Sequence, residues 1–238
     1  MLSALSKSGE ILAEQVNKLD GPFSCPMCKE DVIVKKGRVK VDHFAHMPAS
    51  DCSYGSGESE EHRQAKKEIY QALKNHPQVS KLKLERSLGD VRPDISFYLC
   101  STPIAIEVQV STLPLDTIDR RTASYTSKGI YLLWVSPYDR AMKYIQKYSP
   151  RLWEKYIHTM YFGKVYYWSE GQTLQPVRFD PYRLYVEETE YGGGYYRNSK
   201  RYRTPCLLEP TMITTLSTIK RKPWNESGLS VPAAKLWG

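Results

Sequence analysis

The chain has 238 residues, with 41% hydrophobic and 25% charged residues, as is typical of a globular protein with one good core and room for a small second module. Its 34 Lys and Arg against 26 Asp and Glu give a net charge of +8, which favours a polyanionic partner such as DNA. No apolar run approaches the ~20 residues that span a bilayer. Residues 1–15 contain no signal-peptide core, so we expect a cytoplasmic protein with no membrane partner.

The first part of the chain, residues 1–56, is predicted to be a small zinc-binding module. Five cysteines, three of them near the N-terminus, suit metal binding in a reducing compartment better than a disulfide framework. A Cys-x2-Cys knuckle precedes an alternating stretch, residues 32–41, that predicts a β-hairpin, and a second His and Cys group follows. For the four ligand places we expect Cys25, Cys28, His46 and Cys52, with His43 as the substitute. So small a module has little core, so the Zn²⁺ would be structural.

A glycine-rich connector leads into the second part, residues 57–137. Ser59 is expected to cap a helix from Glu60 to about Asn75, whose buried stripe contains Ala65, Ile69, Ala72 and Leu73. Glu61 and His62 flank that stripe, so they are the helix residues that can face a neighbouring active site. The alternatives are a solvated acidic first turn for Glu61 and a core-capping role for His62.

Three strands are predicted next, at residues 79–85, 91–99 and 104–111, and they would form a meander. Alternation in the third strand puts Glu107 and Gln109 on one face, and a turn near residues 102–103 would bring Asp94 beside Glu107. Two carboxylates and an amide on one face suit a hard divalent cation such as Mg²⁺ or Mn²⁺. The alternative is an ordinary hairpin with solvated acids.

A second helix, residues 117–128, and a strand, residues 130–135, complete this part. Gly129 would end the helix, and the strand is apolar throughout, which indicates a strand covered on both faces and reached by a right-handed crossover from a parallel neighbour. Arg121 and Tyr125 share a helix face. They are candidates for contact with a phosphate, or are ordinary surface residues.

The remaining residues are predicted to form an extension, residues 138–189, and a basic, tyrosine-rich tail, residues 190–238. The extension would contain two helices, at 138–148 and 151–160, and short strands at 165–168, 176–179 and 182–187. In the tail, tyrosines alternate with Arg and Lys, which suits stacking on bases and contact with phosphates. The same composition favours a poorly ordered tail, and that interpretation is slightly preferred.

Several of these motifs together resemble two related groups of proteins. Pro93-Asp94 followed by Glu107-x-Gln109 resembles the PD-(D/E)xK nuclease superfamily, with Gln109 in the place of the usual Lys. The wider pattern is similar to the competence protein CoiA-like family. It consists of the Cys25 and Cys28 knuckle, the stretch His43–His46, Cys52, the stretch Gly57–His62, Lys66, the two strand motifs with Arg92 and Ser111, Arg121 with Tyr125, Trp134-Val135 and the stretch Trp153–Trp168.

The resemblance implies an α/β fold with a PD-(D/E)xK restriction-endonuclease-like core (helix, three-stranded meander, helix, strand), an N-terminal zinc-ribbon-like module and a C-terminal α+β extension. It also implies a Mg²⁺- or Mn²⁺-dependent deoxyribonuclease that acts in DNA uptake and recombination during competence and transformation, with DNA and recombination or DNA-uptake proteins as partners. The implied roles are metal ligation by Asp94 and Glu107, water orientation by Gln109, and support from Glu61 and His62 on the first helix.

Three hypotheses about the function follow from these residues. In the nuclease hypothesis, Arg92, Arg121 and Tyr125 would bind substrate. In the second, the chain is a non-catalytic DNA-binding adaptor on a nuclease-like fold, which the uncharged Gln109 and the basic tail support. The third is a structural zinc protein that binds another protein, and it leaves the acids on the strands unexplained.

Overall fold

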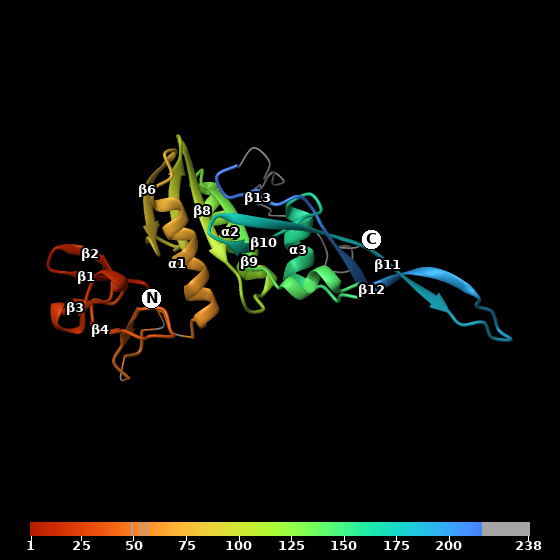
Figure 1. Cartoon of the computed structure of the whole chain (residues 1–238), viewed down its shortest axis with the longest axis horizontal. Coiled ribbons are helices and arrows are strands. Elements are labelled where there is room, and N and C mark those ends of the chain that lie inside the picture. Colours follow the sequence, from red (N-terminus) through yellow and green to blue (C-terminus); the bar gives the residue numbers. More distant parts are fainter. Residues whose placement is uncertain (49, 53, 56, 216–238) are drawn as a thin grey trace. The chain divides into compact units, whose positions relative to one another are not determined.

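The structure is a computed structural model that describes residues 1–48, 50–52, 54–55 and 57–215 (Figure 1). The chain divides into two compact units, Met1–Val110 and Ser111–Gly238. Both contain helices and strands, so the chain is a mixed α/β protein. Within the described ranges, no helix is long and apolar enough to cross a membrane.

The first unit begins with a five-stranded sheet in the order β2-β1-β3-β4-β5. The strands are β1 (Ser3–Ser6), β2 (Gly9–Leu12), β3 (Phe23–Ser24), β4 (Asp31–Lys35) and β5 (His43–His46), and two short 3-10 helices, η1 (Ala13–Gln15) and η2 (Lys18–Asp20), lie between β2 and β3. Phe23 and Phe44 form the centre of a small apolar core, with ring centroids 5.1 Å apart. A core this small leaves room for a metal to stabilise the module.

The hairpin expected at residues 32–41 is present with a different second strand. β4 pairs with β5, so the returning strand begins at His43 and the connecting loop covers residues 36–42. Lys36 closes this loop because its ammonium group donates to Asp42 at 2.9 Å and to the Ala13 carbonyl at 2.8 Å. The alternation that predicted a strand through Val41 therefore belongs to a loop closed by an ion pair.

The first long helix, α1 (Glu60–Lys74), matches its prediction closely. The Ser59 side chain accepts a hydrogen bond from the His62 amide at 3.2 Å, which is the expected N-cap. The helix buries Ala65, Ile69 and Leu73 together with Lys66, a charged residue in the middle of the apolar stripe. That burial requires partners of opposite charge.

The predicted meander is also present. β6 (Val79–Leu84), β7 (Ile95–Leu99) and β8 (Thr102–Val108) pair antiparallel in sequence order. The register sets Ile95 opposite Ile106, so the next pair along brings Asp94 opposite Glu107. Residues opposite one another in an antiparallel pair project to the same face, so both carboxylates leave the same side of the hairpin.

The second unit contains α2 (Leu115–Ser127), β9 (Tyr131–Pro137), α3 (Leu152–Met160) and β10 (Val165–Glu170). β9 and β10 run parallel. The helices are tied into the unit by polar contacts between side chains: Trp134 donates to Thr122 at 3.1 Å, and Tyr156 donates to Asp119 at 2.9 Å. The apolar run at 130–135 is thus a buried strand, as expected.

The prediction of a helix at residues 138–148, the first in the extension, is wrong. Only a 3-10 helix, η3 (Arg140–Tyr144), forms in residues 138–148. The chain then extends, because the Tyr148 amide and carbonyl both bond to the backbone of Arg203 at 2.8 Å. A pairing with a residue far along the chain overrides the local helical tendency.

The prediction of a poorly ordered tail is also wrong for residues 190–215, the part of it that the structure describes. The strands expected at 176–179 and 182–187 are one long strand, β11 (Thr173–Val186), and residues from the expected tail form β12 (Tyr195–Leu207) antiparallel to it. A short strand, β13 (Thr211–Met212), also pairs with β11. Residues 216–238 of the predicted tail lie outside the described residues.

Candidate functional site

Four side chains of the N-terminal module form a Cys3His cluster: Cys25, Cys28, His46 and Cys52. One ligand atom from each lies within 4.8 Å of all the others. The Cys28 Sγ and His46 Nε2 atoms are 3.3 Å apart. Three sulfur donors and one imidazole nitrogen are a usual ligand set for structural Zn²⁺, so this cluster suits zinc.

The backbone of the knuckle turns tightly and donates a hydrogen bond to one of the sulfur atoms. The Met27 amide donates to Cys25 Sγ at 3.3 Å, and Lys29 turns the chain with a φ of 66°. Desolvation, together with the neighbouring Cys52 and Cys25 thiols, raises the pKa of Cys28 to about 11. The Cys28 thiol is therefore protonated at neutral pH in the absence of a cation, and metal binding would release its proton.

His43 is placed differently from His46. Its Nδ1 donates to the Val41 carbonyl at 2.8 Å, and desolvation lowers its pKa. Of the two histidines offered by the sequence, His46 is the one that joins the cysteines, as expected.

A second cluster joins the start of α1 to the meander. His62 bridges two carboxylates: its Nδ1 lies 3.2 Å from Glu58 Oε1, and its Nε2 lies 3.1 Å from Asp94 Oδ2. Ligand atoms of Glu58, His62 and Asp94 fall within 4.8 Å of one another. The same Asp94 oxygen accepts the Val108 amide at 2.8 Å, which fixes the carboxylate to the end of β8.

Lys66 lies among the acids of this cluster. Its ammonium group is ion-paired with Glu58 and Glu85 and lies 3.7 Å from Asp94 Oδ1, and its side chain is only 2% exposed. Glu85 is buried as well, and it accepts hydrogen bonds from the Tyr54 hydroxyl at 2.5 Å and the Leu2 amide at 3.2 Å. Three carboxylates thus converge on one ammonium group.

The ion pairs favour the ionised forms of Asp94 and Glu85 by lowering their pKa values. Burial alone would raise the pKa of Asp94, but the hydrogen bond from His62 and the charge of Lys66 outweigh it and lower that pKa to about 2. Burial likewise opposes ionisation of Glu85, and the Lys66 charge more than offsets it, so the pKa of Glu85 is lowered. The same carboxylates raise the pKa of Lys66, against the effect of its burial.

A cleft of about 330 Å³ opens beside the second cluster, and Glu58, His62 and Asp94 all line it. Arg92 lines it too, with its guanidinium 4.2 Å from the centre of the Tyr54 ring. A carboxylate that is 16% exposed in such a cleft is accessible to small ligands and to water.

The other predicted residues of the first unit, Glu61, Glu107 and Gln109, are not among the residues that line this cleft. Glu107 and Gln109 are buried at the end of β8, 2% and 7% exposed. Glu61 is exposed, and Glu58 takes the place expected for it beside His62. Arg121 and Tyr125 belong to the second unit, where Arg121 lies 5.6 Å from the Trp134 ring centre and Tyr125 is fully buried.

Sequence reasoning missed Glu58, Lys66 and Glu85 as members of the cluster. The spacing of His62 and Lys66 is a signal for Lys66, because residues four apart lie on one helix face, whereas Glu58 precedes the helix cap and carries no such signal. Glu85 carries no such signal, since it follows a strand and resembles any acid in a loop.

Comparison with known proteins identifies the family. The model for "Competence protein CoiA, nuclease-like domain" matches residues 58–179, which is half of the chain, and the model for "Competence protein CoiA, N-terminal domain" matches residues 8–55. The chain belongs to the CoiA family. Competence protein CoiA of Bacillus subtilis (strain 168) is 30% identical over 119 residues, covering 50% of this chain and 32% of that relative. No solved structure matches this CoiA-family chain.

The matched residues include both clusters. The N-terminal CoiA model covers all four residues of the Cys3His cluster, and the nuclease-like model begins at Glu58 and covers His62, Lys66 and Asp94. The match to the Bacillus protein spans about a third of that protein's length. The outer end of β11 and all of β12 lie beyond both family models.

The Cys3His cluster predicts that the purified protein contains about one Zn²⁺ per chain. Cys52→Ser and His46→Asn are each expected to lose most of this zinc and to lower the melting temperature, because the ion replaces the core that the module lacks. Elemental analysis by mass spectrometry measures the metal. His43→Asn is the matched control and keeps its zinc; loss of zinc in His43→Asn with retention in His46→Asn would contradict the assignment.

Because of the Lys66 ion pairs, we predict that replacing Lys66 reverses the direction in which the free energy of unfolding changes with pH. In the native chain, the lowered pKa values of Asp94 and Glu85 give stability that is present above about pH 4 and lost as the pH falls towards about 2. Lys66→Met removes the cation, so burial raises the carboxyl pKa values, and the variant becomes more stable as the pH falls from 7 to about 5.

Thermal unfolding followed by circular dichroism measures how stability changes with pH in the native chain and in the Lys66→Met variant. At pH 7 the Lys66→Met variant is expected to lose about 3 to 5 kcal/mol, as when one partner of a buried pair is removed. Lys67→Met is the control, because that ammonium group is 33% exposed and lies 3.7 Å from Glu14. An unchanged pH slope in Lys66→Met would show that Lys66 does not control these acids.

Proposed function

We propose that this chain is a metal-dependent deoxyribonuclease that hydrolyses DNA phosphodiester bonds, with a structural zinc module at its N-terminus. The observation that carries the proposal is the position of Asp94, which lines a cleft, contacts His62 and immediately precedes the Ile95↔Ile106 pair at the end of the β7–β8 ladder. The nuclease-like family model over residues 58–179 supports it. Since the Bacillus relative is named a competence protein, the proposed setting is DNA uptake and recombination during competence.

The residues around the cleft suit a divalent cation. Asp94 and Glu58 supply carboxylate oxygens and His62 supplies an imidazole, a set that fits Mn²⁺ or Mg²⁺. Glu107, buried near the end of the β7–β8 ladder, is the further carboxylate that we propose for this site. Such an ion, when bound, lowers the pKa of its water and polarises a phosphoryl oxygen. The proposed magnesium or manganese ligands are therefore Asp94 and Glu107, joined by Glu58 and His62.

The chain's own residues have distinct roles in this proposal. Asp94 stays ionised because His62 and Lys66 surround it, so it is ready to bind a cation at neutral pH. Gln109 can hydrogen-bond a water but brings no charge. Lys66, from the helix, supplies the positive charge close to Asp94 that the third motif position lacks. Arg92 lines the cleft and is the proposed phosphate contact.

The second candidate function is a non-catalytic DNA-binding adaptor. It is favoured by the position of Lys66, whose ammonium group already neutralises the acids that an ion would need. In an adaptor, this ion pair would be purely structural, and the cleft would bind no metal. Contact of Arg121 with a phosphate stays a prediction under either function, whereas Tyr125 is fully buried and has no surface with which to meet one.

Cleavage of labelled single-stranded, duplex and branched DNA with Mg²⁺ or Mn²⁺ tests the proposal. The intact protein is expected to cut at least one substrate, and Asp94→Asn, Glu107→Gln and Glu58→Gln are each expected to lose about 100-fold or more of the rate, as for loss of a group that stabilises the transition state. Asn and Gln keep the size of each side chain while removing its charge.

Glu61→Gln is the matched control, because Glu61 is an exposed acid on the same helix as His62. It is expected to keep the rate of the intact protein within about twofold, as a surface substitution should. No metal-dependent cutting of any substrate, with DNA binding retained, would exclude the nuclease and leave the adaptor.

A further inference from the structure

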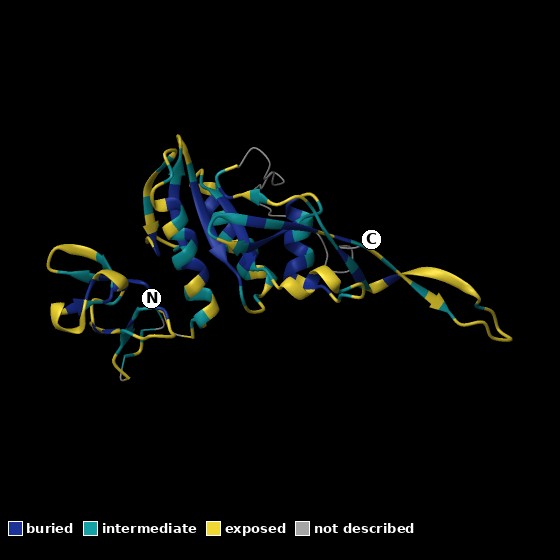
Figure 2. Cartoon of the chain, viewed as in Figure 1, coloured by how far each residue is buried: buried dark blue, intermediate teal, exposed yellow. Residues whose placement is uncertain are grey.

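The ends of β11 and β12 form a two-stranded ribbon, residues 182–202, which we call the arm. Four residue pairs continue the ladder beyond a bulge that follows Pro181, from Arg183↔Asn198 to Val186↔Tyr195. Figure 2 shows exposed residues along both strands of the arm. A hairpin with so little core is stable only as an extension of a larger sheet, which is the inner part of β11 and β12.

The turn that closes the arm has a defined structure. The Thr189 amide donates to the Gly192 carbonyl at 2.9 Å, and the Gly192 amide donates back at 3.0 Å. Gly193 has a φ of 121°, and a Cβ there would overlap the Glu187 carbonyl oxygen. The turn therefore requires glycine, which is typical of a built hairpin.

One face of the arm carries a row of aromatic and cationic side chains. Tyr185 and Tyr196 lie opposite each other, with ring centroids 5.1 Å apart and planes inclined by 55°. The Arg183 guanidinium lies 5.2 Å from the centre of the Tyr196 ring. Tyr185 and Tyr196 are 45% and 60% exposed, so much of each ring is open to a ligand.

A second group of the same kind lies at the base of the arm. Tyr182 and Tyr202 meet edge to face at 6.3 Å, and the Lys147 ammonium lies 4.4 Å from the centre of the Tyr202 ring. Arg201 lies 5.2 Å from the same ring. Because a strand rises about 3.3 Å per residue, the step from Tyr182 to Tyr185 sets the two aromatic groups about 10 Å apart along the ribbon.

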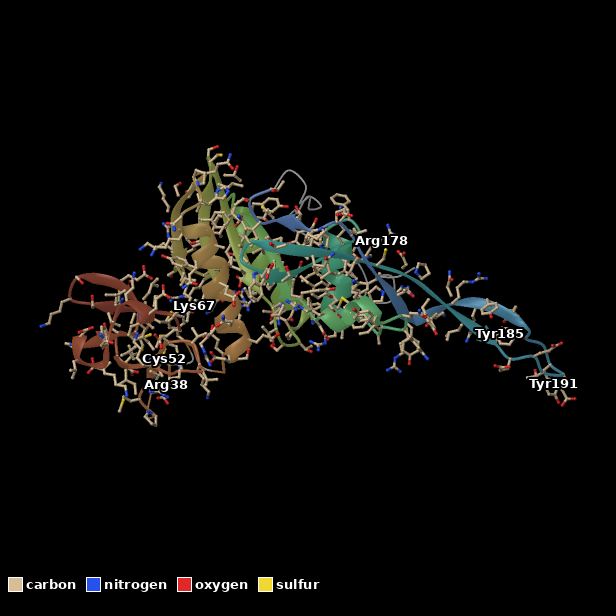
Figure 3. All side chains as sticks on the ribbon, in the orientation of Figure 1. Arg38, Cys52, Lys67, Arg178, Tyr185 and Tyr191 are labelled. Carbon is tan, nitrogen blue, oxygen red and sulfur yellow. The ribbon has the colours of Figure 1, made fainter. Side chains whose placement is uncertain are left out.

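Charge is divided between the two ends of the arm. The strands carry exposed cations at Arg183, Arg197, Lys200 and Arg201, whereas the turn carries exposed acids at Glu187, Glu188 and Glu190. Figure 3 shows Tyr185 on the strands and Tyr191 at the acidic end. A polyanion would therefore lie along the strands and avoid the turn.

We propose that the arm binds single-stranded DNA. The DNA bases would stack on Tyr185 and Tyr196 and on the two tyrosines where the arm begins, Tyr182 and Tyr202, and the flanking cations would hold the phosphates. Tyrosine rings stack on the faces of unpaired bases, which a duplex keeps covered. Insertion of the ribbon into a duplex groove would press the acidic turn against phosphates on both sides, so a duplex is the poorer ligand. The proposal rests on the proposed function only for the choice of DNA, and it places a binding surface outside the family model, which ends at residue 179.

Fluorescence anisotropy with a labelled oligothymidylate in EDTA tests the arm without cleavage. The full chain is expected to bind this single strand more tightly than a duplex of the same length, and Tyr185→Ala with Tyr196→Ala is expected to weaken binding about 10-fold or more. Arg183→Ala is expected to lower the salt dependence, removing about 0.7 from the slope of log K against log salt concentration.

Tyr191→Ala is the matched control, because Tyr191 is 95% exposed but lies in the acidic turn, and it is expected to bind as the intact chain does. Unchanged binding by the double tyrosine variant would overturn the proposal, and so would a preference for duplex DNA. A dimer that the double variant dissociates without loss of DNA affinity would assign the arm to contact between copies instead, which also overturns it.

The two proposals fail separately. Arm-dependent binding in EDTA without cutting in Mg²⁺ or Mn²⁺ would remove the nuclease and keep the arm. Cutting that depends on Asp94, together with binding that ignores Tyr185 and Tyr196, would keep the nuclease and remove the arm.

Discussion

One buried ammonium group, that of Lys66, holds together the acids of the second cluster, which we call the acidic cluster. Glu58, Glu85 and Asp94 converge on it, and the more deeply buried carboxylates among them would not remain ionised without that charge. The cost of burying a lysine on the apolar face of α1 is offset only where several carboxylates meet it. The cluster is therefore a unit, and removing one member changes the charge state of the others.

The zinc module and the acidic cluster are linked through Glu85. Its carboxylate accepts from the Leu2 amide and from the Tyr54 hydroxyl, and Tyr54 follows Cys52 by two residues. We expect bound zinc to hold Cys52 in place, and Tyr54, two residues further on, lies beside the cleft and meets Arg92. A structural ion can thus influence the neighbouring site without touching a substrate.

Much of this organisation could be predicted from the sequence. Helix α1 and the meander follow from local periodicity, and the hairpin register runs to Ile95↔Ile106, the pair next to Asp94 and Glu107. The members of the Cys3His cluster follow from the knuckle spacing, and the choice of His46 over His43 agrees with its nearness to Cys52. Local patterns succeed where a few neighbouring residues decide the structure.

Other features depend on contacts between distant residues, and local patterns do not show them. Glu85 looks like an ordinary surface charge in the sequence, because only the fold brings it to Lys66, which lies 19 residues away along the chain. Residues 195–207 look like a polar tail, because their strand exists only through pairing with β11. The helix expected at 138–148 is lost to a backbone pairing with Arg203 for the same reason.

The most direct test of the metal site is the location of Mn²⁺ in crystals of the full chain, read from its anomalous scattering. We expect a peak within coordination distance of Asp94, shared with Glu58, His62 or Glu107, and a weaker or absent peak in Asp94→Asn. Crystals with Mn²⁺ in excess that show no peak at Asp94, with Lys66 still paired to the three acids, would contradict the claim that this cluster is a metal-dependent nuclease site.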